Sequence, residues 1–255
     1  MARIRPEQIE ALEQSAQLRF EDEMVRHLGQ FAPGHCRAIG APAVREVIRL
    51  GMQRAGTYGL TRRGAVRFYI ELMFLLGSDF DTDPQYPWAS WGLNGRWTDD
   101  QMARADQLHA RLQDYLDKTA GPGRQYALDA MRTLRDTPPG SLAPSAAGRP
   151  DALFREMERI YPRKCRYVGD RPLRALIARG EDLARTHGLT SDRGAALFTA
   201  LIFVMGHGLA DDPLHPWVAK TLRDASITDP DELAERLEAR ARTYLARALK
   251  NLERR

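Results

Sequence analysis

The chain has 255 residues, of which 43% are hydrophobic, so it can bury the core of one large domain or of two small ones. It lacks the run of about 18 apolar residues that a membrane-spanning helix needs, and its first residues lack the apolar segment of a secretory signal. The net charge of +4 is a small excess over closely mixed charges of both signs, so it does not by itself indicate a nucleic-acid partner. We therefore expect a cytoplasmic protein.

The first part of the chain has the pattern of consecutive helices. A helix is predicted from Pro6 to about Phe31, because apolar residues recur there at spacings of three and four. A second helix is predicted over residues 42–57. A third begins with Thr61 as its N-cap and ends at Gly77, and its apolar last turn indicates a central position.

The remaining chain continues the helical pattern. A long loop is expected over residues 78–97, after which Thr98-Asp99-Asp100-Gln101 matches a capping box that opens a fourth helix. A further helix over residues 125–135 is expected to close this first unit. Asp229-Pro230-Asp231-Glu232 opens a last helix that runs almost to Arg255. No period-two strand pattern occurs, so the predicted fold is all-α.

The sequence also repeats itself with an offset of 129 residues. Residues 36–93 align with residues 165–222 without a gap, and 19 of the 58 aligned positions are identical. Cys36 and Cys165 are equivalent in this alignment, so we interpret them as two copies of one buried small residue and not as a bridge or a reactive pair. The pattern predicts a tandem duplication of a four-helix unit, with the two units packed about a pseudo-twofold axis.

The repeat sets the expected domain boundaries. The first unit covers residues 1–136, including the closing helix, and the second covers residues 151–255. Between them, residues 137–150 are rich in proline, glycine and alanine, which is the composition of an extended linker.

The loop after the third helix of each unit is the best candidate site. In both copies a glycine is followed by an Asp-Pro and a Pro-Trp pair, so we expect Asp83 and Asp212 to cap backbone amides and Trp88 and Trp217 to pin the loop.

Two chemical alternatives remain open for these loops. Asp79, Asp81 and Asp83 alternate as calcium ligands would, although the glycine and the glutamate of an EF-hand are missing. In the second copy, His207, Asp211 or Asp212, and His215 are suitable ligands for zinc or iron. The first copy does not repeat that ligand set, so we expect no metal or other cofactor.

No catalytic arrangement is recognisable in the sequence. There is no Ser-His-Asp or Cys-His pattern, no P-loop and no GxGxxG motif, and the two copies share no pair of reactive residues. A nucleic-acid interface is a further alternative, built from the arginines of the second and third helices, namely Arg45, Arg49, Arg54, Arg62, Arg63 and Arg67. Acidic residues are mixed among them, which is more typical of a solvated face.

The stretch Tyr69–Ala89 (sequence YIELMFLLGSDFDTDPQYPWA) resembles a signature of small helical proteins encoded beside type VI secretion effector and spike-tip genes in proteobacteria. The N-terminal segment 4–8 and the turn at residues 58–61 fit the same resemblance, which covers roughly residues 1–117. The resemblance implies an accessory role as an adaptor, an effector chaperone or an immunity protein. It implies no catalytic residues.

The sequence therefore predicts a non-catalytic helical module that binds another protein, a secreted effector or its carrier. Trp91 and Trp97 lie at the tip of the first loop and have no tryptophan counterpart in the second copy, so they join the candidate binding surface. The alternatives are a metal-dependent enzyme using the His207/His215 loop and a nucleic-acid-binding helical protein.

Overall fold

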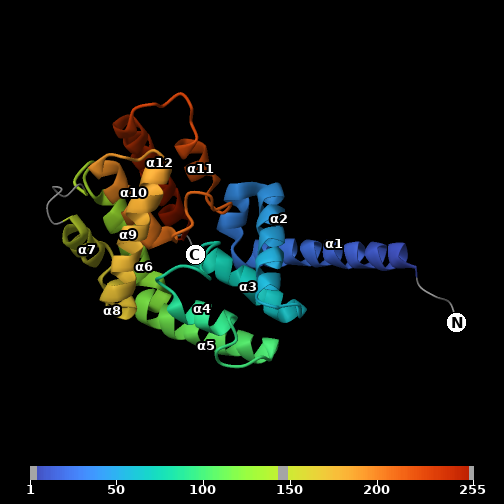
Figure 1. Cartoon of the computed structure of the whole chain (residues 1–255). Helices are drawn as coiled ribbons and strands as arrows, with labels where there is room; N and C mark the ends of the chain where they lie inside the picture. Colours follow the sequence, from blue (N-terminus) through green and yellow to red (C-terminus); the bar gives the residue numbers. More distant parts are fainter. Residues whose placement is uncertain (1–4, 143–148, 253–255) are drawn as a thin grey trace.

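The computed structural model describes residues 5–142 and 149–252. Over these ranges the chain forms twelve α-helices and one 3₁₀ turn and contains no strand, which confirms the predicted all-α class (Figure 1). None of the described helices is long and apolar enough to cross a membrane.

The helices fall into two halves, each with its own hydrophobic core. The first half consists of α1 (Pro6–Phe31), α2 (Pro33–Thr57), α3 (Arg63–Leu76), α4 (Pro87–Leu93) and α5 (Gln101–Thr119). After the 3₁₀ turn Pro122–Arg124, the second half consists of α6 (Gln125–Asp136), α7 (Arg149–Ile160), α8 (Pro162–Val168), α9 (Asp170–Thr186), α10 (Asp192–Met205), α11 (Pro216–Leu222) and α12 (Pro230–Leu252).

Helix bounds recur at the offset of the sequence repeat. The first residues of α3 and α10, of α4 and α11, and of α5 and α12 each differ by 129 positions. α2 corresponds to α8 and α9 together, because Gly40 interrupts α2 at φ 82° and ψ 159° and Gly169 separates α8 from α9 at φ 83° and ψ 166°. Both halves therefore contain the same glycine kink.

Some predicted boundaries move in the structure. The second helix begins at Pro33 rather than near residue 42, because a proline-initiated segment precedes the Gly40 kink. The loops predicted after α3 and α10 each contain a short helix that starts at a proline, α4 and α11. The cap of α5 is Asp100, whose carboxylate accepts the amides of Met102 at 3.0 Å and Ala103 at 2.9 Å.

The helix predicted to close the first unit packs on the second half instead. Ala130 and Leu134 of α6 lie 2% and 5% exposed in the core that α7, α9, α10 and α12 build. Arg242 of α12 donates from Nη1 to the carbonyl oxygen of Arg135 at 2.9 Å and from Nη2 to that of Thr137. The polypeptide thus crosses from one core to the other at the 3₁₀ turn, before the predicted linker.

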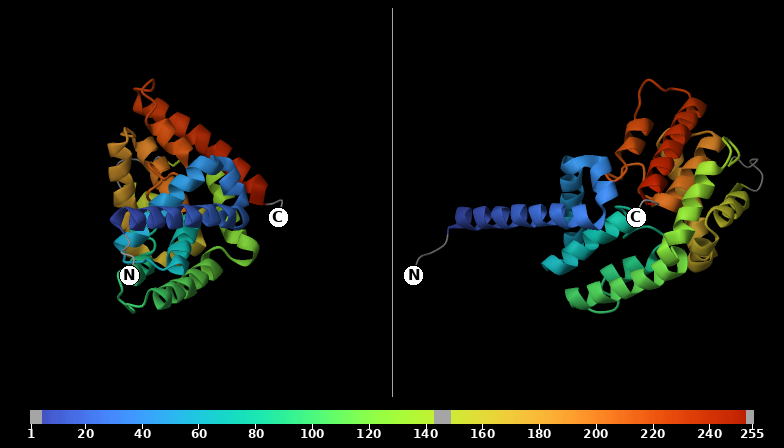
Figure 2. Two further views of the ribbon diagram at one scale, coloured as in Figure 1. Left: turned by 90° about the vertical axis from the view of Figure 1, so that its right-hand side faces the viewer. Right: turned by 180° about the vertical axis from the view of Figure 1, so that it is seen from behind.

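The N-terminal part of α1 projects from the molecule. The described side chains between Glu7 and Arg19 are all exposed, whereas Phe20, Met24 and Leu28 are buried against the rest of the first half. Figure 2 shows this segment extending away from the other helices. We call Pro6–Arg19 the arm.

Both cysteines are free thiols, as predicted. Cys165 is buried, and burial raises the pKa of its thiol to about 12. Cys36 is half-buried, and its Sγ donates to the carbonyl oxygen of Leu28 at 3.3 Å.

Candidate functional site

The glycines that end α3 and α10, Gly77 and Gly206, lie next to each other where the two halves are in contact. Gly77 has φ 101° and Gly206 has φ 105°, a conformation that favours glycine. A Cβ atom on Gly206 would lie 2.9 Å from the carbonyl oxygen of Leu76, and one on Gly77 would lie 3.1 Å from that of Met205. Both positions need glycine because of the backbone conformation and because two main chains approach closely.

Asp83 and Asp212 connect the loop after α3 with the loop after α10, because each carboxylate accepts a hydrogen bond from the opposite loop. Asp83 Oδ2 accepts from the His207 amide at 2.9 Å, and Asp212 Oδ2 accepts from the Ser78 amide at 3.0 Å. The second oxygen of each carboxylate accepts the amide two residues further along its own loop, at 2.8 Å in both cases. Each aspartate therefore caps its own loop, as predicted, and also bonds the opposite half. We call Gly77, Gly206, Asp83 and Asp212 the seam.

A basic side chain flanks the seam on each side. Lys164 Nζ donates to the carbonyl oxygen of Phe203 at 2.6 Å and lies 5.5 Å from the ring centroid of Tyr86, in the other half. Burial lowers the pKa of this amine to about 8. His35 and His215, the counterparts of Lys164 and Tyr86, have ring centroids 5.3 Å apart, and His35 Nε2 lies 2.8 Å from a carbonyl oxygen of the opposite half. These contacts anchor each half to the other.

Two histidines of the second half are buried beside the seam. His207 Nε2 lies 3.0 Å from Thr82 Oγ1 and 3.1 Å from the carbonyl oxygen of Asp79. His215 packs edge-on against Tyr244, with ring centroids 5.4 Å apart. Burial lowers the pKa of both histidines, to about 3 for His215, so the neutral form is favoured at neutral pH.

The alternating aspartates of the first loop do not converge. Asp79 and Asp81 both pair with Arg54, and Asp81 also accepts from the Tyr69 hydroxyl at 2.8 Å. Asp83 instead faces the seam. The calcium alternative is therefore wrong, because Asp79 and Asp81 are both paired with Arg54 and Asp83 is directed to the opposite loop, so the three carboxylates do not surround one point.

The transition-metal alternative fails for a similar reason. Asp211 pairs at the surface with Arg223, while His207 and His215 contact different groups of the first half and of α12. Across the described part of the chain, no group of three or more His, Cys, Asp or Glu side chains is arranged to hold a metal ion.

Three of the four predicted tryptophans pack against the protein. Trp88 is 7% exposed and its ring centroid lies 6.5 Å from that of Tyr115, while Trp217 stacks on Tyr244 with centroids 5.5 Å apart. Trp97 is half-buried, and the guanidinium carbon of Arg111 lies over the tryptophan ring, 5.8 Å from the ring centroid. These side chains hold the loops and α4 or α11 against the last helix of each half.

Trp91 is the predicted binding residue that stays at the surface, 48% exposed on α4. Its counterpart in the second half is Lys220, a polar residue. Over the described residues the other exposed large apolar side chains also lie in the first half, namely Leu12, Leu18, Leu75 and Met102. The two halves therefore differ most at their outer surfaces.

The arginines of the nucleic-acid alternative are paired with carboxylates. The pairs are Arg45 and Arg49 with Glu21, Arg54 with Asp79 and Asp81, Arg62 with Asp100, Arg63 with Glu23, and Arg67 with Glu71. Because these charges are balanced locally, the geometry does not favour phosphate binding.

The contacts of Lys164 and His35 beside the seam were not predicted from the sequence. His35 and Lys164 fall one position before the aligned block, at equivalent places in the repeat, and both are basic. The sequence feature that could have indicated these contacts is the basic residue directly before each of the two aligned cysteines. No protein-family model, curated protein or solved structure matches this chain, so its function has to be argued from geometry.

Proposed function

We propose that this chain is a non-catalytic helical module whose first half binds another protein. The observation that carries the proposal is the distribution of exposed apolar side chains, which over the described residues all belong to the first half. Trp91 carries the most weight among them, because tryptophan is enriched at the residues that contribute most to binding in protein interfaces. The second half repeats α3, α4 and α5 as α10, α11 and α12 and exposes no large apolar side chain among the described residues, so it serves as an internal reference.

The buried polar groups of the seam support a structural role. Asp83, Asp212 and Lys164 direct their oxygens or amine to main-chain groups of the protein itself, which leaves no free reactive pair. Two small pockets, one beside α12 and one between α3 and α5, each have a volume of about 10 Å³. Such a volume holds at most a water molecule, and neither pocket fits a substrate.

We infer that the two halves arose by tandem duplication and pack about a pseudo-twofold axis. The matching helix offsets, the paired glycine kinks at Gly40 and Gly169, and the reciprocal bonds of Asp83 and Asp212 support this inference. In this interpretation the second half maintains the fold, and the first half can change its surface residues and gain a binding site.

The resemblance of the Tyr69–Ala89 stretch supports a more specific proposal. It favours an adaptor, a chaperone or an immunity protein, whose partner is a secreted effector or its spike-tip carrier. Proteins encoded by neighbouring genes are therefore the first partners to test.

Binding to the purified products of the neighbouring genes, measured by calorimetry, tests the proposal. Trp91→Ala is expected to weaken binding at least tenfold, because a tryptophan at the centre of an interface commonly contributes more than about 1.4 kcal/mol. Lys220→Ala, at the equivalent position of the second half, is the matched control and should leave binding unchanged. Absence of binding by every such protein at micromolar concentration would refute the proposed function.

A further inference from the structure

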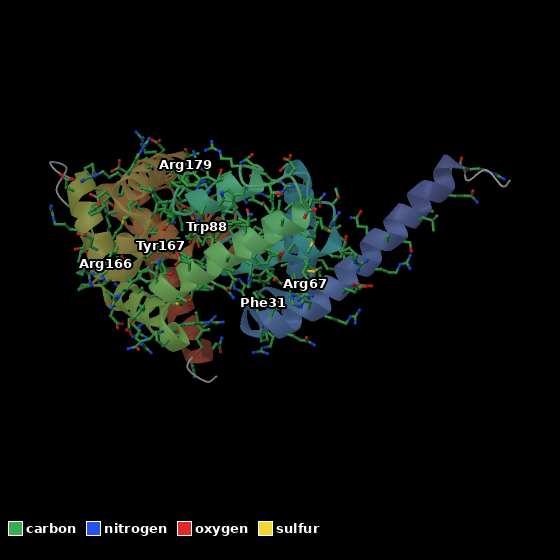
Figure 3. The ribbon with its side chains drawn as sticks, turned by 90° about the horizontal axis from the view of Figure 1, so that it is seen from below. Phe31, Arg67, Trp88, Arg166, Tyr167 and Arg179 are labelled. Carbon is green, nitrogen blue, oxygen red and sulfur yellow. The ribbon has the colours of Figure 1, made fainter. Side chains whose placement is uncertain are left out.

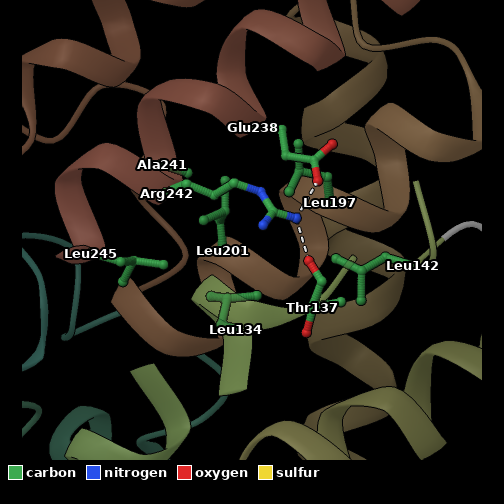
Figure 4. Close-up of a pocket in the computed structure, with 9 residues that line it drawn as sticks. All are labelled: Leu134, Thr137, Leu142, Leu197, Leu201, Glu238, Ala241, Arg242 and Leu245. Carbon is green, nitrogen blue, oxygen red and sulfur yellow. Dashed lines mark hydrogen bonds and ion pairs between the residues drawn. The ribbon is translucent and has the colours of Figure 1, made fainter. Parts of the chain in front are cut away.

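The second half shows what covers the surface that the first half leaves open. α6 and the residues after it lie on α10 and α12, where Leu134 and Leu142 cover Leu197 and Leu201 (Figure 4). Leu197 is 5% exposed there. An amphipathic helix therefore belongs on this surface in the second half.

Among the residues that the structure describes, no such helix lies on the corresponding surface of the first half. The counterparts of Leu197, Val204 and Leu245 are Phe68, Leu75 and Leu116, on α3 and α5. Phe68 and Leu116 are half-buried, whereas their counterparts Leu197 and Leu245 are 5% and 2% exposed. Leu75 is 39% exposed, and its counterpart Val204 is half-buried. Met102 is 37% exposed and lies at the start of α5, 14 residues before Leu116. This spacing is close to four helical turns, so Met102 and Leu116 lie on nearly the same side of α5. We call Phe68, Leu75, Met102 and Leu116 the α3–α5 face.

The arm carries exposed apolar side chains that no other described segment covers. Leu12 and Ala16 continue the stripe of Phe20 and Met24 that is buried further along α1, because a spacing of four keeps residues on one side of a helix. Leu12 is nevertheless 60% exposed. A helical segment of this length is marginal in water unless its apolar stripe is packed.

The arm matches α6 in size and in its order along the chain, but not in the register of the repeat. α6 precedes α7, and the arm precedes the part of α1 that corresponds to α7, but at the offset of 129 residues the arm aligns with residues 135–148, after most of α6. At 1.5 Å per residue, the arm is about 21 Å long and α6 about 18 Å. Both carry apolar residues at helical spacing, which in α6 include Ala130 and Leu134.

The arm cannot reach the α3–α5 face of its own chain. α1 is one continuous helix, and its buried part is fixed by packing on α2. Figures 2 and 3 show the arm extending beyond the other helices, with its side chains clear of the rest of the chain. The face and the arm can meet only between two copies.

We propose that this protein forms a closed dimer in which the arm of each copy lies on the α3–α5 face of the other. Each arm then occupies the place that α6 takes on α10 and α12. The dimer covers Leu12, Leu75 and Met102, three of the exposed apolar side chains cited for the proposed function, and leaves Trp91 on α4 to the partner protein. The two proposals have separate tests, because the dimer is probed at Leu12 and Leu75 and partner binding is probed at Trp91.

Sedimentation equilibrium of the full chain over a concentration series tests the dimer. The expected mass is twice 28.8 kDa. Leu12→Glu on the arm and Leu75→Glu on the face should each weaken dimerisation at least tenfold. Leu18→Glu is the matched control, because Leu18 is also exposed in the arm but lies on the other side of the helix from Ala16 and Phe20. It should leave the dimer intact.

A mixture of the Leu12→Glu and Leu75→Glu chains gives a second readout. Each mixed pair keeps one intact arm on one intact face, so the mixture should dimerise more tightly than either variant alone. A wild-type chain that stays monomeric, a Leu75→Glu chain that dimerises like the wild type, or an assembly larger than a dimer would each overturn the proposal. Far-ultraviolet circular dichroism of each variant confirms that it is folded.

Discussion

The two halves are alike where they touch each other and different where they face outward. At the seam, Asp83 and Asp212 make equivalent bonds with distances within 0.1 Å of each other. At the surface, Trp91 of the first half is replaced by Lys220 of the second. The contacts between the halves restrict both halves together, because a side chain at the seam must fit the opposite half, whereas residues on the outer faces are not restricted in this way.

The largest effect is expected from adding a side chain at Gly206, where the loops after α3 and α10 approach each other closely. Gly206→Ala should lower the free energy of unfolding by about 3 kcal/mol or more, because the new Cβ meets both an unfavourable backbone conformation and the carbonyl oxygen of Leu76. Gly169→Ala is the control, since it has a similar φ but open space around the Cβ, and it should cost roughly 1–2 kcal/mol. Equal losses in urea unfolding would show that the close approach contributes nothing.

The next effect concerns the reciprocal carboxylates. Asp83→Ala and Asp212→Ala should each lower the free energy of unfolding by about 2–3 kcal/mol, because each leaves two buried amides without an acceptor. The double variant should deviate from additivity by at least about 0.5 kcal/mol, since the two groups join the same loops. Asp211→Ala, which removes an exposed pair with Arg223, should change stability by less than about 0.5 kcal/mol. Strict additivity would indicate that the two loops are energetically independent.

His215, one of the two buried histidines of the second half, makes the stability of the protein depend on pH. An unfolded chain protonates histidine near pH 6.5, whereas burial lowers the pKa of His215 to about 3 in the folded state. Between these values the unfolded state binds the extra proton, so stability falls as pH decreases, by about 1.4 kcal/mol per pH unit.

His215→Tyr places the residue of the first half, Tyr86, at the equivalent position of the second half. This change removes the titrating group, so the slope of stability against pH between about pH 4 and 6 should become shallower by about 1.4 kcal/mol per unit. Urea unfolding at a series of pH values measures it. An unchanged slope would mean that His215 is accessible to protons in the folded protein.

The smallest effect distinguishes the two outer faces directly. Leu75→Ala in dilute monomeric protein should lower the free energy of unfolding by less than about 0.5 kcal/mol, because the side chain is 39% exposed. Val204→Ala at the equivalent position should cost about 1 kcal/mol, because that side chain packs against the core of the second half. A larger loss at Leu75 would show that the first face is covered.

The sequence by itself determined the helical class, the bounds of α1, the glycine ends of α3 and α10, and the capping role of Asp83 and Asp212. These features depend on local spacing, on capping chemistry and on the repeat, all of which are visible in one dimension. Only the tertiary structure decided that α6 packs on the second half, that Lys164 and His35 flank the seam, and that Trp91 is exposed while Trp88 is buried. Those outcomes depend on which helix faces meet in space, because burial and pairing are set by packing between residues distant in the chain.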